Sequence, residues 1–572
     1  MVGGCSTLPC HNRRTVRRLS TPLFAAILIV ALVPLLALAI FGGPAATPGV
    51  LPSGSASAAA IGSGSGSPGA GGSTGTSEEP SGSDGSPTAV ADPPPSTPTG
   101  PVTAVAVVPV VDFRSTVTDL AAADVTAVLA GTDKRWKTVD LVAGDADGIL
   151  KALPAAGVTG ALDPARIVRF ANASALARAL AKDSNRLGFV RASQVTPAVR
   201  ALGWDGRTLF GVDRVKTAGA WKLKAQLRGD AHPFDPAGTW TIVAGGDILL
   251  DRGVYKQVEI LGKGADFPFD GGTARIVSRH CCSSFGWPIP TAKRTGNAGA
   301  VRHLLKGADI AVANFENPAP NAPKYHTQGT VFSADPRLIS GLKDAGIDVV
   351  SIANNHIGDA GKAGILQTIA NLDRYGLKHA GAGKNAAAAH QPAIVNIGGT
   401  RVAILAYDTI AKYYTAGAST AGSARLTAAG AKADIAAARA AGADVVIVYP
   451  HWGTEYDPTP FPAQQALARA VIDAGADMII GNHAHWVGAM EVYKGHPIWY
   501  ALGNFVFDQV WSEPTQEGLI LELTFNGKPL VQAQLHPTLI LDQAQPNFLD
   551  PAGDGRVVLG QLYDASKGLL PW

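Results

Sequence analysis

Acidic, amide and imidazole side chains recur where apolar runs end in the second half of the chain. Carboxylate, amide and imidazole groups are ligands for Mn, Zn or Fe, and the lack of Cys among them argues against a soft-metal site. The set is Asp247 after TIVAGG, Glu316 after IAVANF, Asn355 and His356 after VVSIAN, His451 after VVIVYP, and His483 and His485 in IIGNHAH.

Each of these residues alone has an ordinary structural explanation. An Asp that follows a strand is often a helix N-cap, and Glu316 before Asn317-Pro318 could begin a turn. A single His is more often a hydrogen-bonded polar residue than a ligand. Five run ends that carry such residues together favour a metal site over five separate structural roles.

The stretch IIGNHAH at 479–485 permits two interpretations. Gly-Asn-His could supply a metal-binding Asn followed by a catalytic His. His-x-His could equally be a pair of metal ligands. The seven residues alone do not choose between them.

The elements that must position these residues read as strands alternating with helices. Near-continuous apolar runs separated by helical stretches indicate strands covered on both faces, as in an α/β sheet. Ligands of such sheets bind beyond the carboxyl ends of the strands, where all these side chains stand. The helical stretches include PRLISGLKDAG, GKAGILQTIANLDRYG, TAAGAKADIAAARAAG and PAQQALARAVIDAG, and the later runs EGLILELTFNG and PLVQAQLHPTLIL look antiparallel.

Ordered motifs between about 240 and 510 resemble the CapA-type capsule (poly-γ-glutamate) synthesis family. They are GDILLDRG, ANFENP, DAGIDVVSIANNHIGDAGKAGILQTIANLDRYGLKHAGAG, HWGTEY and GADMIIGNHAHWVGAMEVYKGHPIWYALGNFVFD. The resemblance implies a metallophosphoesterase-like (calcineurin-like) fold, a four-layer sandwich of two sheets flanked by helices. In that plan the Asn-His motif comes third and the His-x-His pair last, so GNHAH takes the second interpretation and Asn482 is not a ligand.

The resemblance also implies a role for each residue. Asp247 and His485 would bind a first metal, Asn355, His451 and His483 a second, and Glu316 would bridge them. His356 would be the general acid, oriented by Asp359 or His379, and Arg252 would hold an anionic group of the substrate or else form a surface salt bridge. Residues two apart on an extended segment point the same way, so His483 and His485 would face one cluster.

The first metal half lacks one usual ligand. Metallophosphoesterases open with Asp-x-His, whereas Leu249 stands two residues after Asp247. One metal in place of two, or a site that binds without turnover, would follow. His326 could fill the gap from another loop.

The N-terminus reads as a membrane anchor followed by a tether. Residues 1–22 contain four arginines and would stay in the cytoplasm, and residues 23–41 form an uncharged apolar run close to the ~20 residues that span a bilayer. A cleaved signal peptide is the alternative. Residues 42–102, rich in Gly, Ser and Pro, predict a disordered linker. This organisation predicts a single-pass protein of the cell membrane with extracytoplasmic C-terminal domains.

The remaining 470 residues or so divide into two folded blocks and a tail. Residues 103–235 predict a small α/β module, weakly similar to part of a solute-binding domain. Residues 238–543 predict the CapA-type domain, and residues 544–572 a C-terminal tail. Adjacent Cys281 and Cys282 would lie on the oxidising side, as a disulfide or as two thiols.

Charge and family resemblance together bound the function. The formal charge of +3 without basic runs gives no case for nucleic acid. We expect a metal-dependent hydrolase acting on a phosphoester or an anionic polymer, with capsule-synthesis membrane proteins as partners. The alternatives are a non-catalytic subunit for polymer export or attachment, and a hydrolase of γ-glutamyl amide bonds.

Overall fold

The computed structural model describes residues 100–229 and 234–570. The predicted cytoplasmic segment, the membrane anchor at 23–41 and linker residues 42–99 therefore lie outside the described residues. Among the helices of the described ranges, none combines the length and the apolarity that crossing a bilayer requires.

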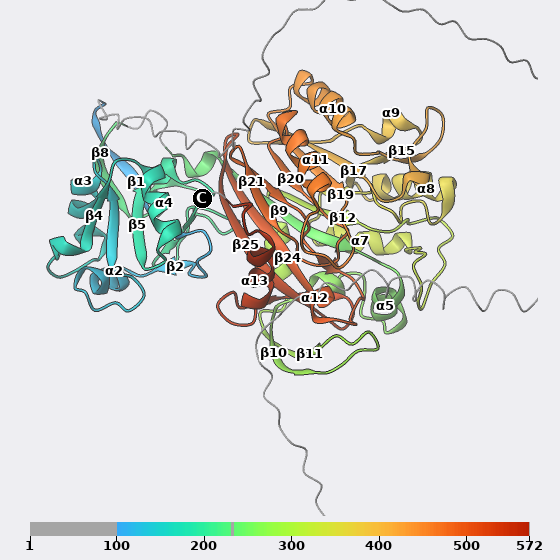
Figure 1. Cartoon of the computed structure of the whole chain (residues 1–572), viewed down its shortest axis with the longest axis horizontal. Helices are drawn as coiled ribbons and strands as arrows, with labels where there is room; N and C mark the ends of the chain where they lie inside the picture. Colours follow the sequence, from blue (N-terminus) through green and yellow to red (C-terminus); the bar gives the residue numbers. More distant parts are fainter. Residues whose placement is uncertain (1–99, 230–233, 571–572) are drawn as a thin grey trace, which may run out of the picture. The chain divides into compact units, whose positions relative to one another are not determined.

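Residues 102–228 form an α/β sheet with a hydrophobic core of its own (Figure 1). Helices α2 (Ala122–Leu129), α3 (Ala146–Ala152) and α4 (Ala173–Lys182) contribute Val125, Ile149 and Leu176 to that core. The strands in sheet order are β4 (Ile167–Phe170), β3 (Thr138–Val142), β5 (Arg186–Arg191), β1 (Val102–Asp112) and β6 (Val199–Ala201), and β8 (Lys224–Arg228) also pairs with β1.

The larger part of the chain contains two further sheets. The ten-stranded sheet runs β11 (Ile289–Gly296), β10 (Thr273–His280), β26 (Gln545–Leu549), β25 (Leu530–Leu541), β24 (Glu517–Asn526), β9 (Thr239–Ile248), β12 (Ile310–Phe315), β13 (Val349–Ser351) and β14 (Lys378–Ala380), with β23 (Asn504–Val506) paired to β9. The six-stranded sheet runs β16 (Ala393–Ile397), β17 (Thr400–Asp408), β19 (Val445–His451), β20 (Met478–Ile480), β22 (His496–Trp499) and β21 (Met490–Tyr493).

The two sheets pack face to face and helices cover their outer faces. Strand β9 is buried along its whole length, and its alternate residues enter different cores. Ile242 and Ala244 meet residues of the six-stranded sheet, such as Ile447, in the inner core. Val243 faces outward, into the core made with the helices. This alternation follows from the two-residue period of a strand.

The outer layers are helices α6 (Ala300–Gly307), α7 (Ile339–Asp344) and α8 (Gly361–Arg374) on the ten-stranded sheet, and α10 (Ala428–Ala440) and α11 (Pro462–Asp473) on the six-stranded sheet (Figure 1). In α10 the hydroxyl of Thr427 caps the N-terminus, and the buried residues Ala431, Ile435 and Ala438 lie on one face. The predicted α/β class is confirmed, and the layers run helix, sheet, sheet, helix.

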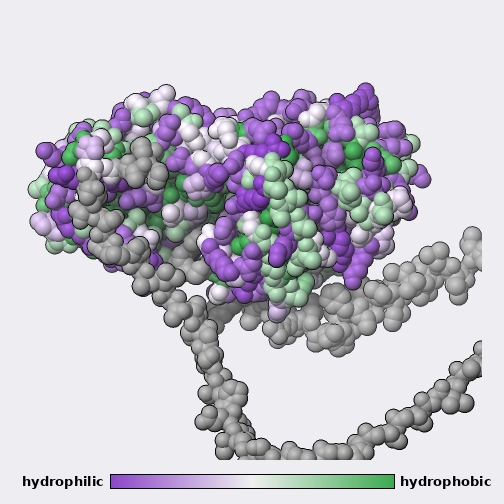
Figure 2. All heavy atoms as spheres, turned by 90° about the horizontal axis from the view of Figure 1, so that it is seen from above, coloured by the Kyte–Doolittle hydropathy of each residue, from purple (hydrophilic) through white to green (hydrophobic). Residues whose placement is uncertain are grey.

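Hydrophilic residues cover much of the face shown in Figure 2.

The C-terminal residues belong to the sandwich. Residues 544–572 were expected as a tail, but β26 pairs with β25 and β10, and Val558 and Leu562 of α13 (Arg556–Ala565) lie in the inner core. The expected antiparallel pairing of β24 with β25 is present. Strand β26 is only five residues long and its sequence, QPNFL, is not a continuous apolar run, so its signal in the sequence is weak.

Cys281 and Cys282 form a disulfide in the structure. They lie in the loop that joins β10 to β11, a hairpin whose outer half is exposed. Of the two alternatives that the sequence left open, the structure contains the disulfide.

Glu522 of β24 is buried and links strand to loop. Its carboxylate accepts the backbone N–H of Val212 at 2.6 Å, and its other oxygen lies 2.7 Å from Nε2 of His536. Burial alone would raise the pKa of Glu522, but the contacts with His536 and Val212 outweigh it and lower that pKa. Its charged form is therefore better stabilised in the folded than in the unfolded chain.

We expect Glu522→Gln to destabilise the protein at neutral pH and to do so less at low pH. The contribution of a group with a lowered folded pKa is complete above its unfolded pKa, about 4.3 for Glu, and disappears as pH falls through the folded pKa. Urea midpoints of the two proteins, measured from pH 7 to 3, should converge at the acid end. Glu259→Gln, at a partly exposed carboxylate paired with Arg337, is the control. A gap that widens toward acid would contradict the assignment.

Candidate metal centre

Parallel strands of the ten-stranded sheet bring the first acidic residues together. Strand β12 pairs with β9 so that Asn314 lies opposite Asp247, and the N–H of Glu316 donates to the carbonyl of Ile248. Strand β13 pairs with β12 in parallel, and Asn355 and His356 follow it in a turn. All these residues stand at the carboxyl ends of their strands, where α/β sheets bind ligands.

The six-stranded sheet supplies the imidazoles from the facing layer. His451 ends β19, and the segment 481–486 follows β20. Backbone hydrogen bonds from Asn482 to Pro450 and from Trp452 to Asn482 join this segment to the end of β19. Asn482 thus has a backbone role here.

The segment that carries His483 and His485 is bent, which corrects the expectation of an extended His-x-His. His483 has φ +95° and His485 has φ +55°, in the left-handed region that residues with a Cβ seldom adopt. Such strain persists only when the surrounding structure holds it, and it concentrates at functional sites. The bend sends the two rings to different partners, with their centroids 6.2 Å apart.

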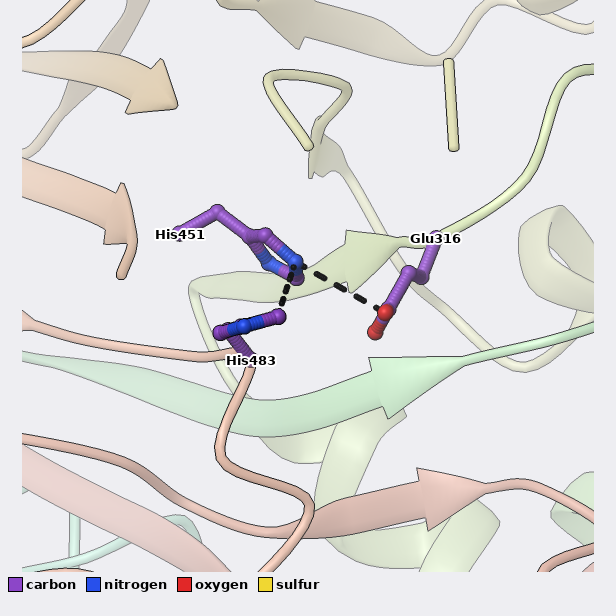
Figure 3. Close-up of side chains that lie close together, drawn as sticks. All are labelled: Glu316, His451 and His483. Carbon is purple, nitrogen blue, oxygen red and sulfur yellow. Dashed lines mark hydrogen bonds and ion pairs between the residues drawn. The ribbon is translucent and has the colours of Figure 1, made fainter. Parts of the chain in front are cut away.

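The ligand-type atoms form two groups that share Glu316. One group is Glu316, His451 and His483, which point toward one another in Figure 3, and the other is Asp247, Glu316 and His485. Within each group the possible ligand atoms lie within 4.8 Å of one another, and every member is buried. Apart from Asn355, these are the same two sets that the family resemblance implies.

In the group of His451, the ring contacts are short. Nε2 of His451 lies 3.6 Å from Oε1 of Glu316, 3.1 Å from Nδ1 of His483 and 2.7 Å from Oδ1 of Asn355. Asn355 therefore lies beside this group, and its amide nitrogen is 3.0 Å from Nε2 of His356.

In the group of Asp247, His485 lies between the two carboxylates. Its Nδ1 is 3.5 Å from Oδ2 of Asp247, and its Nε2 is 3.7 Å from Oε1 of Glu316. Oδ1 of Asn504, from β23, lies 2.9 Å from Nδ1 of the same ring. Strand β23 places Asn504 opposite Asp247.

Glu316 indicates that a cation fits between these residues. Its carboxylate is fully buried, and Oε1 has no hydrogen-bond partner among the described residues. Burial and the neighbouring Asp247 carboxylate raise its pKa well above the ordinary range. A buried carboxylate oxygen without a partner costs free energy that a bound cation would recover. The donors, carboxylate and imidazole, suit Mn, Zn or Fe.

Burial keeps two of the imidazoles neutral. Burial and the neighbouring His483 lower the pKa of His451 well below its usual value, and burial with His485 lowers that of His483 to about 3. Burial also disfavours charge on His485, but Asp247 outweighs it and raises the pKa of that ring. Neutral imidazole is the form that ligates metal ions, so His451 and His483 need not lose a proton to bind one.

His356 stands at the edge of the clusters in a different environment. Its Nε2 is 4.0 Å from Oε1 of Glu316, and its ring packs against Phe332 at a tilt of 32°, with centroids 4.0 Å apart. Nδ1 lies 2.9 Å from Asp359. Of the two residues suggested as orienting groups, Asp359 makes this contact, whereas the ring of His379 lies 3.3 Å from Asp373.

Arg252 lies over the aromatic rings that border the site. Its guanidinium is 4.8 Å from the centroid of Phe332, and it donates to Asp508 and to the carbonyl of Gly329. The expected salt bridge exists, but it is mostly buried and not on the surface. Nε is buried and has no partner in the described ranges. The positive charge of Arg252 partly offsets the rise in the pKa of Glu316.

Leu249 fills its position with a hydrophobic contact and no ligand. It packs in a small cluster with Phe332, Phe507 and Ile540. His326 does not fill the gap, since its Nδ1 lies 2.6 Å from Asp251. The rings around Leu249 also contact His356 and His485. Apolar side chains therefore occupy the position where a further metal ligand would lie.

Two asparagines were missed by the sequence reasoning. Nδ2 of Asn314 donates to Asp247 at 2.7 Å and lies 3.2 Å from Nδ1 of His451, which makes it a link between the two groups. Asn504 contacts His485, as described. The available signal was a single amide in each of two otherwise apolar strands, ANF and GNFVF, since a buried amide needs partners.

Comparisons with known proteins agree with the motifs. Residues 241–509 match the family described as bacterial capsule synthesis protein PGA_cap. The capsule biosynthesis protein CapA of Bacillus anthracis is 35% identical over 290 residues, which cover 48% of this chain and 70% of that protein. The PGA biosynthesis protein CapA of Bacillus subtilis is 34% identical over 226 residues, 38% of this chain and 59% of that protein.

A solved structure of a calcineurin-like phosphoesterase from Bacillus subtilis is also similar. It has 13% sequence identity and a TM-score of 0.32, and the match covers 58% of this chain and 97% of that one.

Proposed function

Because the chain belongs to the bacterial capsule synthesis family that includes the CapA proteins, we propose that it serves capsule assembly through a metal-dependent hydrolase site. The substrate that we propose is a phosphoester, and an anionic capsule polymer of the poly-γ-glutamate type is the other substrate class that the family resemblance suggests. Residues 23–41 would anchor the chain in the cell membrane, with residues 1–22 in the cytoplasm and the folded parts outside, next to capsule-synthesis membrane proteins.

One observation carries the hydrolase proposal: two buried groups of metal-ligand type share Glu316, whose Oε1 has no hydrogen-bond partner among the described residues. Asp247, Glu316 and His485 would hold one divalent ion, and Glu316, His451 and His483 with Asn355 a second. When bound, paired divalent ions polarise a phosphoryl group and make water a nucleophile at neutral pH.

The chain's own residues would do the rest of the chemistry. His356 lies beside the clusters with Nδ1 fixed against Asp359. Its Nε2 is 3.0 Å from the amide nitrogen of Asn355 and 4.0 Å from Glu316, and would exchange the Asn355 contact for the leaving oxygen to which it gives a proton. His is the side chain that most often serves as a general acid. Packing against Phe332 holds the ring in place. The guanidinium of Arg252, which lies over Phe332, would hold an anionic oxygen of the substrate.

A second reaction fits the same groups. A site that polarises a phosphoryl oxygen can polarise an amide carbonyl, so γ-glutamyl amide bonds are an alternative substrate. Leu249, Phe332 and Phe507 leave the Asp247 group with three ligand-type side chains. This favours tight binding of an ion at only one half of the centre, the half that contains His451 and His483.

The test is hydrolysis by the purified full chain with added Mn²⁺ or Zn²⁺. We expect release of phosphate from an aryl phosphate, abolished by EDTA and by Asp247→Ala. Asp140→Ala, at a buried Asp paired with Arg186 in the other sheet, should retain activity if the variant remains folded. Hydrolysis of a γ-glutamyl anilide without phosphate release would identify the amide reaction. Inertness toward both would contradict the hydrolase proposal.

A further inference from the structure

A series of aromatic rings leads from the candidate metal centre to the surface. Tyr456 stacks on His485 with centroids 6.0 Å apart and meets the ring of Trp511 edge-on at 4.8 Å. Two ring pairs continue toward the surface. The ring centroids of Trp511 and Phe285 are 5.4 Å apart, and those of Trp486 and Trp287 are the same distance apart.

The outer rings come from the loop of the β10–β11 hairpin and are exposed. Phe285 is 68% exposed and Trp287 is 37% exposed. Arg279 fixes the hairpin through a two-armed ion pair with Glu513, and the N–H of Glu513 donates to the carbonyl of Pro288. Large aromatic side chains that are held in place yet left in water mark ligand-binding surfaces.

Three polar groups accompany these rings: the indole N–H of Trp486, the hydroxyl of Tyr456 and the carboxylate of Glu455. Trp486 is 9% exposed, and its Nε1 has no hydrogen-bond partner in the part of the chain that the structure describes. A buried indole N–H normally finds an acceptor. The hydroxyl of Tyr456 and the exposed carboxylate of Glu455 lie on the same turn. Tyr456 has φ +62°, so the turn holds its ring beside His485 at the expense of backbone strain.

The angles between the rings distinguish two kinds of ligand. Trp287 and Trp486 meet at 86°, and Tyr456 and Trp511 at 81°. A planar base gains most from stacking along parallel rings, and these outer rings are nearly perpendicular. A pyranose ring instead lays its C–H groups on the negative face of one aromatic ring, and its hydroxyls need donors and acceptors around that ring.

We propose that Trp287, Trp486, Tyr456 and Phe285 form a sugar-binding subsite continuous with the metal centre, which takes a pyranose ring of a glycan. The indole N–H of Trp486 donates to a sugar hydroxyl, and Glu455 accepts from another. The inference rests on the proposed function only for its consequence, which is that the phosphoester cleaved at the metal centre is glycan-linked.

The test is calorimetric titration of the full chain, made metal-free with EDTA, with N,N′-diacetylchitobiose. We expect saturable binding that Trp287→Ala weakens about tenfold. Trp486→Phe keeps a ring and removes the donor, and should weaken binding about fivefold. Phe461→Ala, at another exposed aromatic residue, should leave the affinity unchanged.

Three results would overturn the subsite. They are no binding at millimolar disaccharide, binding that Trp287→Ala and Trp486→Phe leave unchanged, and tighter binding of AMP or of an acyclic γ-glutamyl tetrapeptide with the same dependence on Trp287. Because the titration uses metal-free protein, it is independent of turnover. Sugar binding without any hydrolysis would refute the proposed function and keep the subsite, and hydrolysis without sugar binding would do the reverse.

Discussion

Replacing Glu316 by Gln is expected to remove divalent metal from both halves of the centre and to abolish hydrolysis. Glu316 belongs to both ligand groups, and its Oε1 lies within 4.0 Å of three imidazoles. An amide oxygen carries no charge to offset that of the ions. Replacing a residue that merely orients a ligand lowers metal affinity or activity about 10- to 100-fold. Replacing the shared carboxylate should therefore lower both by more than about 100-fold. Metal content by mass spectrometry and phosphate release measure the two effects.

The same variant should not destabilise the metal-free protein. Burial and the Asp247 carboxylate raise the pKa of Glu316, so its charged form is unfavourable when no cation is present. In EDTA, the thermal midpoint of Glu316→Gln should equal or exceed that of the wild type. Glu491→Gln replaces another buried carboxylate, paired with Arg469, and should lose stability but keep its metal. A Glu316→Gln protein that retained two ions would refute the shared role.

Replacing His356 by Gln should lower kcat by about 100- to 10,000-fold, the usual contribution of a general acid, while metal content stays unchanged. The ring contacts Asp359 and Phe332 and lies at the edge of the two ligand groups. Metal content by mass spectrometry and kcat give the two readouts.

Asp359→Asn separates orientation from proton transfer. Asp359 accepts the backbone N–H of Phe332 as well as contacting His356, so it positions both the ring and its packing partner. We expect a smaller loss of kcat than in His356→Gln, with metal content unchanged. His390→Gln removes a similar His–Asp pair, with Asp434, elsewhere in the domain. A loss of metal in His356→Gln would show that His356 is a ligand and not the acid.

Much of this arrangement could be predicted because parallel α/β sheets gather the ends of their strands. Apolar runs ending in Asp247, Glu316 and His451 required only that the runs be parallel strands in facing sheets, and they are. The motif order of the family that the chain resembles then separated the two imidazoles of GNHAH from His356 in ANNH, the proposed general acid. The first inference uses chain order and strand period, which a single sequence contains, whereas the second rests on the resemblance.

The remaining features depend on tertiary contacts that leave little trace in the sequence. The bend at His483 and His485 is held by the end of β19 and by Asp247, whose Oδ2 accepts the N–H of His483. No local residue pattern predicts this bend, since neither His483 nor His485 is a Gly. Asn314 and Asn504 look like isolated polar residues until β9 is placed between their strands. Leu249 is explained only by the rings that surround it.

The hairpin rings were equally hidden, because RHCCSSFGW lies about 170 residues before HWGTEY and about 200 before GNHAHW. Only the folded chain brings Trp287 to Trp486 and Phe285 to Trp511.

The most direct test of the central claim is anomalous diffraction from crystals of the full chain grown with Mn²⁺ or Zn²⁺. We predict two anomalous peaks on either side of the Glu316 carboxylate, one beside Asp247 and His485 and one beside His451 and His483. Absence of any peak among these side chains at saturating metal, or ions bound only elsewhere on the chain, would contradict a metal centre at this site.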